Sequence, residues 1–365
     1  MDKPLIIAYY LPQYHPIPEN DEWWGKGFTE WTNVAKAKPL FKGHYQPKIP
    51  ADLGFYDLRV PEVREQQAEL AREAGVDGFC YWHYWFGNGK ELLERPFREV
   101  LESGKPNFPF CLGWANESWE SKIWSKDGVK SKKILIEQTY PGIEDIDNHF
   151  YSLVKAFKDP RYIRIENQPI FHIYQPLNHP NIKFFIDRWN YLVKKENIAS
   201  KFYFIAGAND FNFTEMPKLG FDAAIINLTG RMQTPYKKRN IFLRAFHYFF
   251  RLTLFRPLLI SYKKSLNYLW NEKIDSEEFI IPSLLPNWDH SPRSGSRFFI
   301  LTNPTPQLFK TLCLRVLNGI KNKKNKIIFV KSWNEWGEGN YMEPDMQFGK
   351  GYIKALAEAK KEIYP

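Results

Sequence analysis

The stretch IIFVKSWNEWGEGNYMEP, residues 327–344, changes character after Val330. Up to that point it is a short apolar run, typical of a strand that is buried on both faces. Beyond it, polar and aromatic residues follow, and Glu335 and Glu338 stand three positions apart. The stretch therefore combines a buried strand with two acidic groups placed directly after its carboxyl end.

The same pattern recurs along the whole chain. Apolar runs that end in polar and aromatic residues occupy 5–14, 76–85, 108–118, 168–175, 202–210, 222–230, 279–289 and 326–336. Amphipathic stretches with helical spacing lie between most of them, at 60–75, 90–103, 143–159, 180–197, 305–321 and 350–363. Eight strands that alternate with helices predict a (β/α)8 barrel, the TIM barrel, as a single domain over residues 1–365. The alternative is an open doubly wound sheet, but the glycine-rich loop expected after an early strand of that fold is absent.

Three connections are longer than the rest. The loops after the first and third strands, 15–59 and 119–142, are long enough to carry function. The first contains too many Pro, Gly and Trp residues to predict a helix. After the sixth strand, residues 231–277 form a basic, aromatic insertion that we expect to be helical. Packing against the barrel is the favoured interpretation of this insertion, and binding at a membrane surface is the alternative.

Composition narrows the classes of partner. The chain of 365 residues carries a formal net charge of +10, and 17% of its residues are aromatic. Aromatic excess is common in sugar-binding enzymes, although a large aromatic core gives the same statistic. No nucleic-acid-binding motif accompanies the positive charge, so we expect no nucleic-acid partner. Three scattered cysteines predict neither a disulfide framework nor a zinc site, and Cys80 and Cys111 fall in apolar runs that would bury them as thiols.

The sequence also bears on location. No apolar segment reaches the length of a membrane span, and the first residues lack the hydrophobic stretch of a signal peptide. If this start is the native one, we expect a cytoplasmic protein. The basic insertion leaves open a peripheral contact with the inner membrane or with a lipid-linked glycan. The oligomeric state is left open as well.

The acidic pair carries the main chemical prediction. Active sites of TIM barrels lie at the carboxyl ends of the strands, where Glu335 and Glu338 fall. Paired carboxylates at such a site suit glycoside chemistry. We expect the indoles of Trp333 and Trp336 to desolvate a carboxyl and raise its pKa, and Asn334 to bind a sugar hydroxyl or orient a glutamate. The competing interpretation is a solvated surface pair.

Other residues near the strand ends are predicted to bind substrate. They are Tyr9, Tyr10, His15, Glu30, Trp31, His83, Trp85, Trp114, Asn116, Glu117, Tyr174, Trp288, Asp289 and Arg293, together with Trp333, Asn334 and Trp336 beside the acidic pair. A structural role is the alternative for His15, and a folded loop core is the alternative for Glu30 and Trp31. Glu117 is a candidate third carboxylate, and Arg293 would suit an anionic substituent such as a uronate or phosphate. The sequence implies no metal ion and no cofactor.

Five segments carry a resemblance to a known family. Read in chain order, they are IAYYLPQYHPIPENDEWWGKGFTEWTNV, YWHYWF, LGWANESW, ILIEQTYPG and SWNEWGEGNYMEP. Together they resemble the WbsX-type, family-99-like glycosyl hydrolase and transferase family, from about residue 4 to residue 360. Members are generally encoded among genes for bacterial O-antigen or capsule synthesis. The related family 99 endo-α-mannosidases are (β/α)8 barrels that cleave α-mannosidic bonds with retention and without a metal.

The resemblance also implies a mechanism and leaves three functions open. By motif position, Glu335 would be the base on the sugar 2-hydroxyl and Glu338 the general acid and base. The first function is a retaining, endo-acting hydrolase of an α-linked, mannose-containing glycan. The second is a glycosyltransferase or transglycosylase of polysaccharide synthesis, which the missing signal peptide favours and the absence of a nucleotide-sugar motif disfavours. The third is a barrel that binds glycans without turnover.

Overall fold

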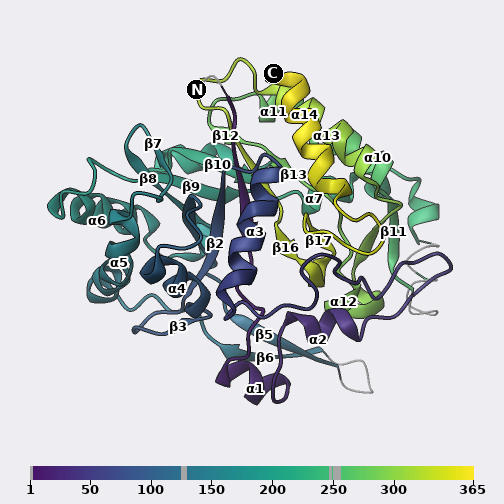
Figure 1. Ribbon diagram of the computed structural model, residues 1–365, viewed down its shortest axis with the longest axis horizontal. Helices are drawn as coiled ribbons and strands as arrows, with labels where there is room; N and C mark the ends of the chain where they lie inside the picture. The colour runs from purple at the N-terminus through teal and green to yellow at the C-terminus, as the bar shows by residue number, and fades with distance from the viewer. Residues whose placement is uncertain (1–2, 125–129, 246–248, 250–255) are drawn as a thin grey trace.

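A computed structural model describes residues 3–124, 130–245, 249 and 256–365, and its centre is a nearly closed parallel barrel (Figure 1). The barrel strands are β1 (Leu5–Tyr10), β2 (Gly78–Trp85), β4 (Phe110–Trp114), β8 (Gln168–Ile173), β9 (Tyr203–Ala208), β10 (Ala223–Ile226), β12 (Ile280–Ile281), β13 (Ser283–Leu284) and β15 (Ile327–Val330). They follow the order β12-β10-β9-β8-β4-β2-β1-β15-β13. All eight predicted strands are present, and the predicted (β/α)8 barrel is confirmed.

The seventh strand of the barrel is divided into two short strands, β12 and β13. β12 pairs with β10 on one side, and β13 pairs with β15 on the other. Pro282 separates the halves because proline has no N–H to contribute to a sheet. Its carbonyl still accepts a hydrogen bond from the N–H of Phe329, at 3.1 Å. One interrupted strand therefore joins both edges of the sheet.

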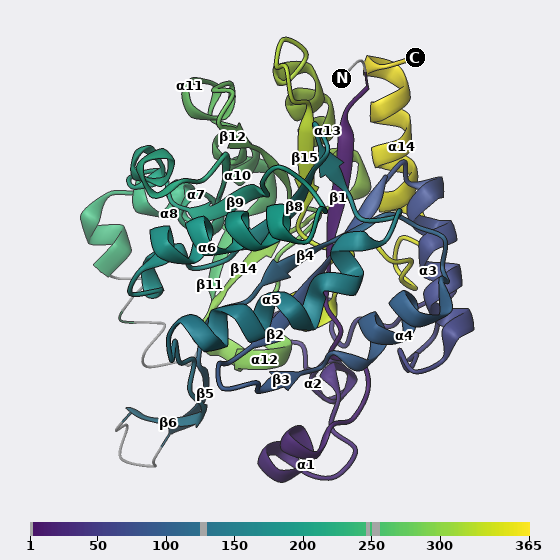
Figure 2. The ribbon, with the colours of Figure 1, turned by 90° about the vertical axis from the view of Figure 1, so that its left-hand side faces the viewer.

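Six helices cover the outside of the barrel at the predicted places. They are α3 (Pro61–Glu73), α4 (Arg95–Ser103), α5 (Ile143–Lys158), α6 (Ile182–Lys195), α13 (Pro306–Gly319) and α14 (Gly351–Ile363). Figure 2 shows α5 and α6 lying along one side of the barrel. Between β9 and β10 only a short 3-10 helix, η2 (Phe213–Leu219), is present. Trp189 of α6 packs on Phe171 of β8 with ring centroids 4.6 Å apart, which illustrates how aromatic residues fill the core. Cys80, Cys111 and Cys313 are buried and free.

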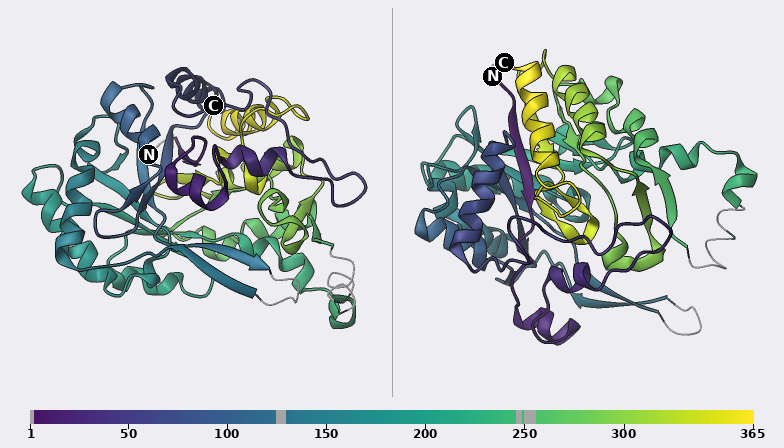
Figure 3. Two further views of the ribbon diagram at one scale, coloured as in Figure 1. Left: turned by 90° about the horizontal axis from the view of Figure 1, so that it is seen from below. Right: turned by 45° about the vertical axis from the view of Figure 1, so that its right-hand side comes forward.

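The two long loops are more ordered than expected. Residues 15–59 contain α1 (Pro18–Trp24) and α2 (Glu30–Ala35), so the expectation of no helix there is wrong. Pro18 is compatible with a helix because it occupies the first turn, where a missing N–H costs no hydrogen bond. The loop after β4 forms an antiparallel hairpin of β5 (Trp119–Trp124) and β6 (Lys130–Ile136). Seen from below, α1, α2 and this hairpin lie on the side where the barrel strands end (Figure 3).

The insertion at 231–277 is helical only in part. Its described helices are α7 (Thr229–Met232), α8 (Thr234–Lys237), residues 241–245, α10 (Tyr262–Leu269) and α11 (Glu272–Asp275). β11 (Leu258–Ser261) pairs with β14 (Phe299–Thr302), a strand pair that the sequence did not predict. Residues 246–248 and 250–255 of the predicted insertion lie outside the described part. Among the helices that are described, none has the length and apolar character needed to cross a bilayer.

Several elements of the structure are only two or three residues long. β3 (Glu91–Leu92) pairs with the carboxyl end of β2, and β7 (Arg164–Ile165) pairs with the start of β8, at the opposite end of the barrel. Two 3-10 turns, η1 (Pro176–Asn178) and η3 (Gly295–Arg297), follow β8 and precede β14. The N- and C-termini lie close together at the end of the barrel opposite the hairpin (Figure 1).

Candidate active site at the carboxyl end of the barrel

The segment that follows β15 folds back on itself across the mouth of the barrel. It contains β16 (Asn334–Glu335), η4 (Trp336–Glu338) and β17 (Asn340–Tyr341), and β16 pairs antiparallel with β17. The turn needs a glycine at Gly339, where φ is +60° and an added Cβ would lie 2.6 Å from Lys48 Nζ. This tight fold brings Glu335 and Glu338 to the same side of the segment.

One guanidinium joins the two glutamates. Arg293 lies on α12 (Ser291–Ser294), and its Nη1 donates to Oε1 of Glu335 at 3.2 Å and to Oε1 of Glu338 at 2.9 Å. Its Nε donates to Oε1 of Glu30 at 2.9 Å. A Cβ on Gly337 would lie 1.7 Å from that Glu30 oxygen, so only glycine leaves room for the contact. Three carboxylates therefore surround a single positive charge.

The same arrangement prepares the site for proton transfer near neutral pH. Burial raises the pKa of Glu335 to about 7, the neighbouring Glu338 charge adds to the rise, and Arg293 opposes it. His290 Nε2 lies 3.6 Å from Oε1 of Glu338. Burial lowers the pKa of His290 to about 4, so its imidazole is neutral at pH 7. The carboxyl of Glu335 therefore holds a proton that is exchangeable near neutral pH.

The acidic pair faces a cleft of about 810 Å³ of empty space. Its walls combine aromatic rings with polar groups, and the lining side chains that matter here are Gln13, Trp82, Tyr84, Glu117, Ser118, Trp119, Tyr174, Arg293, Lys331, Glu335 and Glu338. Rings offer a surface to the apolar face of a sugar, while hydroxyl, amide and carboxylate groups bind its hydroxyls. The cleft thus has the size and the chemistry of a sugar-binding site.

The structure brings part of the predicted set together. Glu335, Glu338, Arg293, Glu117 and Tyr174 line the cleft. Two more predicted residues lie close by: Glu30 is connected to the pair through Arg293 and is almost fully buried, and Tyr9 lines an adjoining cavity. Within the described residues, no group of three or more His, Cys, Asp or Glu side chains is placed to hold a metal ion.

Four predicted residues lie on the opposite face of their strands. The hydroxyl of Tyr10 donates to Oε1 of Gln67 on α3, at 2.6 Å, outside the barrel. His83, Trp85 and Trp114 surround the buried His149 of α5, and the Trp85 ring stacks on it at 4.8 Å. Side chains alternate between the two faces of a strand, so the neighbours of inward-facing residues point outward. The structure places these four in the layer between strands and helices, away from the cleft.

Two predicted loop residues also serve the fold. His15 is buried, with Nδ1 3.0 Å from the carbonyl oxygen of Pro12. Trp31 packs on Trp336 with ring centroids 5.4 Å apart, and its Nε1 donates to the Tyr56 carbonyl at 2.7 Å. These contacts match the structural alternatives for His15 and Trp31.

The side chains of two predicted polar residues near strand ends are hydrogen-bonded to other groups of the protein. Asn116 exchanges two hydrogen bonds with the backbone of Gln175, each at 2.8 Å. Asp289 accepts hydrogen bonds from His44 at 2.8 Å and Gln46 at 2.6 Å, and the His44 contact together with the charge of Lys48 holds its pKa well below the usual range despite burial. Neither side chain lines the cleft, so their predicted contact with sugar is not supported by their position.

The residues flanking the glutamates hold the catalytic segment from the core side. Asn334 accepts from the N–H of Leu11 at 2.7 Å and donates to its carbonyl at 3.0 Å, which ties the segment to the end of β1. Trp336 stacks on Tyr341 at 3.7 Å. Trp333 is fully buried. These indoles are absent from the residues that line the cleft, and their predicted effect on the pKa of a carboxyl stays a prediction.

The sequence interpretation missed Trp82, Tyr84, Trp119 and Lys331, which do line the cleft. The parity of the strands would have identified two of them. Tyr9 is in register with Cys80 on β2, so every second residue after Cys80 shares the face of Tyr9. That rule places Trp82 and Tyr84 on the cleft side of β2, and it places His83 and Trp85 on the opposite face.

The fold of this barrel, which carries paired, arginine-bridged carboxylates at its carboxyl end, is shared with solved structures of other proteins. The solved structures similar to it include a glycoside hydrolase-like protein, with a TM-score of 0.62 and 14% identity over 98% of this chain and 94% of the other. They also include the GH99 endo-alpha-mannosidase from Bacteroides thetaiotaomicron, with a TM-score of 0.58 and 14% identity over 98% and 97%. At this level of identity, the likeness establishes the shared fold.

Sequence comparison establishes the family. The model of the family described as Glycosyltransferase WbsX matches residues 6–356, so the chain belongs to the WbsX family. It is 34% identical to WxcX, an uncharacterized protein of Xanthomonas campestris pv. campestris, over 97% of this chain and 49% of that protein. The chain thus spans about half the length of this relative. Family membership and the barrel fold together support a carbohydrate-active enzyme.

Proposed function

We propose that this chain acts on an α-linked glycan with retention of configuration, using Glu335 and Glu338 and the 2-hydroxyl of the sugar itself. The observation that carries the proposal is the contact of both carboxylates with one Arg293 nitrogen at the edge of an aromatic-lined cleft. The resemblance to family 99 assigns the two roles, and the likeness in fold to a GH99 endo-alpha-mannosidase is consistent with them.

In the first step, the Glu335 carboxylate takes the proton of the sugar 2-hydroxyl. The 2-oxygen then bonds to the anomeric carbon as the glycosidic bond breaks, and Glu338 donates its proton to the departing oxygen. The raised pKa of Glu335 suits a general base, because a base is most effective when its pKa lies near the working pH. Arg293 limits the repulsion between the two acids.

In the second step, Glu338, now a carboxylate, removes a proton from the incoming hydroxyl. That hydroxyl bonds to the anomeric carbon, the bond from the 2-oxygen breaks, and the 2-oxygen recovers its proton from Glu335. Two inversions give net retention without a carboxylate bonded to the sugar, in contrast to the usual retaining mechanism.

Transfer to a second sugar is the alternative outcome of the same chemistry. A sugar hydroxyl in place of water would make a new glycosidic bond, and the family description as a glycosyltransferase favours this outcome. Product analysis distinguishes the two reactions. The protein is incubated with glycan from its own host, with and without nucleotide sugars, and reducing ends and chain lengths are measured.

Variants of the pair test the mechanism. We expect Glu335→Gln and Glu338→Gln each to lower turnover by roughly 10³-fold or more while glycan binding survives, because each removes a proton-transfer step. Glu117→Gln removes a carboxylate from the same cleft that makes no contact with Arg293, and we expect a much smaller loss. Near-normal rates in either of the first two variants would remove that glutamate from the mechanism, and unchanged binding without any turnover in the native protein would favour a binding barrel.

We also propose that the basic insertion contacts an anionic membrane surface. Ile241 and Phe242 are 70% and 80% exposed, and the exposed Lys237 and Lys238 precede them. Apolar side chains beside cations are the pattern of interfacial helices. Sedimentation with phosphatidylglycerol vesicles, and not with phosphatidylcholine vesicles, is the expected result. Phe242→Asp should lower sedimentation with phosphatidylglycerol vesicles. Phe211→Asp, which changes an exposed ring elsewhere on the protein, should not. Equal sedimentation with both lipids would contradict the proposed membrane contact.

A further inference from the structure

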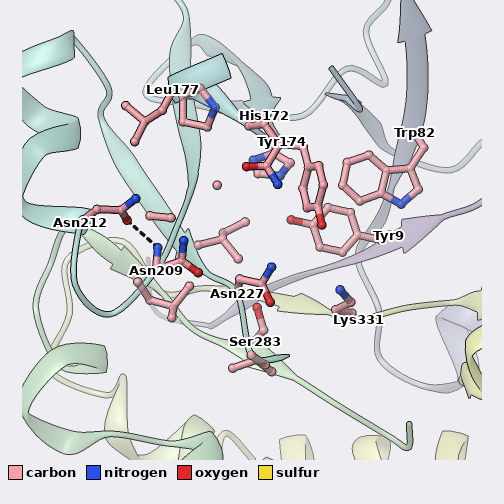
Figure 4. A pocket seen from close by; sticks show the side chains of 17 residues that line it. Tyr9, Trp82, His172, Tyr174, Leu177, Asn209, Asn212, Asn227, Ser283 and Lys331 are labelled. Atoms are coloured by element: carbon pink, nitrogen blue, oxygen red, sulfur yellow. Dashed lines mark hydrogen bonds between the residues drawn. The ribbon is translucent and has the colours of Figure 1, made fainter. Parts of the chain in front are cut away.

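A second cavity adjoins the catalytic cleft near the axis of the barrel (Figure 4). We call it the axial pocket and define it by Tyr9, His172, Asn209, Asn227 and Ser283, which are among its lining residues. These residues belong to, or directly follow, β1, β8, β9, β10 and β13, so the pocket lies where many strands converge. Its empty space of about 650 Å³ includes the part that opens to solvent.

The axial pocket and the catalytic cleft share a wall. Trp82, Tyr174 and Lys331 line both. Lys331 directly follows β15 and is four residues before Glu335. It is close enough to lower the pKa of Glu335. A ligand in the axial pocket would therefore lie beside the acidic pair, as the neighbouring sugar of a bound glycan would.

The two cavities differ in charge. Among the seventeen described residues that line the axial pocket, Lys331 is the one lysine or arginine. No aspartate or glutamate lines it, and burial lowers the pKa of His172 to about 4, which leaves that ring neutral. The catalytic cleft instead contains three carboxylates, Glu117 among them, against two cations. An anionic group on the substrate would be repelled from the cleft and attracted to the axial pocket.

Lys331 has its charge available for a ligand. In the part of the chain that the structure describes, no carboxylate lies within ion-pair distance of its Nζ. Its Nζ lies 5.4 Å from the centroid of the Trp288 ring, and its charge lowers the pKa of the Glu117 and Glu335 carboxyls from beyond ion-pair distance. Arg293, which the sequence offered as the anion-binding residue, is already matched by three carboxylates. The cation that can bind an external anion is therefore Lys331.

The axial pocket also contains polar groups that can bind the uncharged part of an anionic ligand. Asn212 Oδ1 accepts from the N–H of Asn209 at 2.7 Å, and Asn227 Oδ1 accepts from the N–H of Thr229 at 2.9 Å. With the oxygens of Asn212 and Asn227 occupied, their amide NH2 groups remain as hydrogen-bond donors. Figure 4 shows these amides, the Ser283 hydroxyl and Lys331 around the same space. These donors can bind the oxygens of an acidic sugar.

We propose that the axial pocket is a subsite for an acidic sugar unit, in which Lys331 pairs with a carboxylate or a phosphate on the unit next to the scissile bond. The inference rests on the proposed function, because it extends the same substrate site. It assigns the glycan to a chemical class: an acidic polysaccharide that carries a uronic acid or a phosphorylated sugar beside the bond that reacts.

A binding experiment tests the subsite without turnover. The probes are methyl α-D-glucuronide, glucose 6-phosphate and the neutral methyl α-D-glucoside, each titrated into the full chain carrying Glu338→Gln and followed by ligand-observed NMR. We expect at least one acidic probe to bind roughly tenfold more tightly than the neutral one, as one charge-assisted contact would give. The preference should fall as salt is added. Whichever acidic probe binds more tightly identifies the source of the anion.

Substitution assigns the preference to one residue. Lys331→Gln should abolish the discrimination, Lys331→Arg should retain most of it, and Lys183→Gln, which removes an exposed lysine on α6, should leave it intact. Equal affinity for acidic and neutral probes, no saturable binding of either acid, or a preference that survives Lys331→Gln would each overturn the proposal. If the preference depends on Lys331 but no glycan is turned over by the native protein, the subsite stands and the proposed catalysis fails.

Discussion

Glu335→Gln is expected to make the protein more stable at alkaline pH while it abolishes activity. Burial and the Glu338 charge raise the pKa of Glu335 from 4.5 to about 7 in the folded protein. The folded state therefore binds this proton more tightly than the unfolded chain does. The free energy of unfolding must then fall as the pH rises from about 4.5 through about 7.

The size of the effect follows from the shift. A rise of about 2.5 pKa units corresponds to about 3 kcal/mol of lost stability once the pH exceeds 7 by a unit. Glutamine has nearly the shape of the protonated carboxyl and cannot ionise. At pH 8 we thus expect Glu335→Gln to exceed the native protein by about 3 kcal/mol in free energy of unfolding. Near pH 5, where this carboxyl is largely ionised in the unfolded chain and protonated in the folded one, the difference should shrink to about 1 kcal/mol.

Urea unfolding at pH 5 and pH 8 measures this difference. Tryptophan fluorescence and circular dichroism should report coincident transitions, which justifies a two-state free energy. Glu69→Gln, at an exposed glutamate on α3, is the matched control for the change in net charge. A stability difference that is the same at both pH values, or a less stable Glu335→Gln at pH 8, would refute the reasoning.

Three further predictions concern the parts that hold the site. Gly337→Ala should lower turnover by roughly 10²-fold, because the added Cβ would displace the Glu30 carboxylate. The control Gly230→Ala, whose Cβ meets nothing within 4 Å, should keep the normal rate. Equal rates in the two variants would contradict the packing argument. Asn334→Ala should cost about 1–3 kcal/mol in urea unfolding because it leaves buried backbone groups without partners, and an unchanged midpoint would count against this role. Trp119→Ala should raise KM roughly tenfold and leave kcat nearly unchanged, since its ring offers binding surface and no proton; a fall in kcat alone would exclude that role.

The barrel was predictable from the sequence because its strands are buried on both faces. A strand packed between the barrel interior and the helices is apolar throughout, so it appears as a continuous run such as the one at 76–85. The same continuity conceals which residues face inward. His83 and Trp85 were as plausible as Trp82 and Tyr84 because no polar alternation distinguishes the faces. Only the register between neighbouring strands fixes that parity.

The acidic pair was predictable for a different reason, and the roles of its surroundings were not. Glu335 and Glu338 are three residues apart, so their proximity is a local property of the chain. The flanking indoles looked like cleft walls, yet the turn directs Trp336 toward Tyr341 and the core. The folded-back segment from β16 to β17 must bury one of its sides. Large apolar rings are the groups that gain most from burial.

The two cations show where sequence reasoning reached its physical limit. Arg293 and Lys331 both stand near strand ends, and composition alone treats them alike. What separates them is the distribution of carboxylates: Arg293 contacts Glu30, which is 263 positions away in the chain, together with the acidic pair, whereas Lys331 faces an aromatic ring. A guanidinium with five donors in a planar fork can serve several carboxylates at once, and an ammonium on a flexible stem is better suited to a single mobile anion. The chemistry of each cation thus agrees with the position that the fold gives it, and the difference became visible only once the long-range contacts were known.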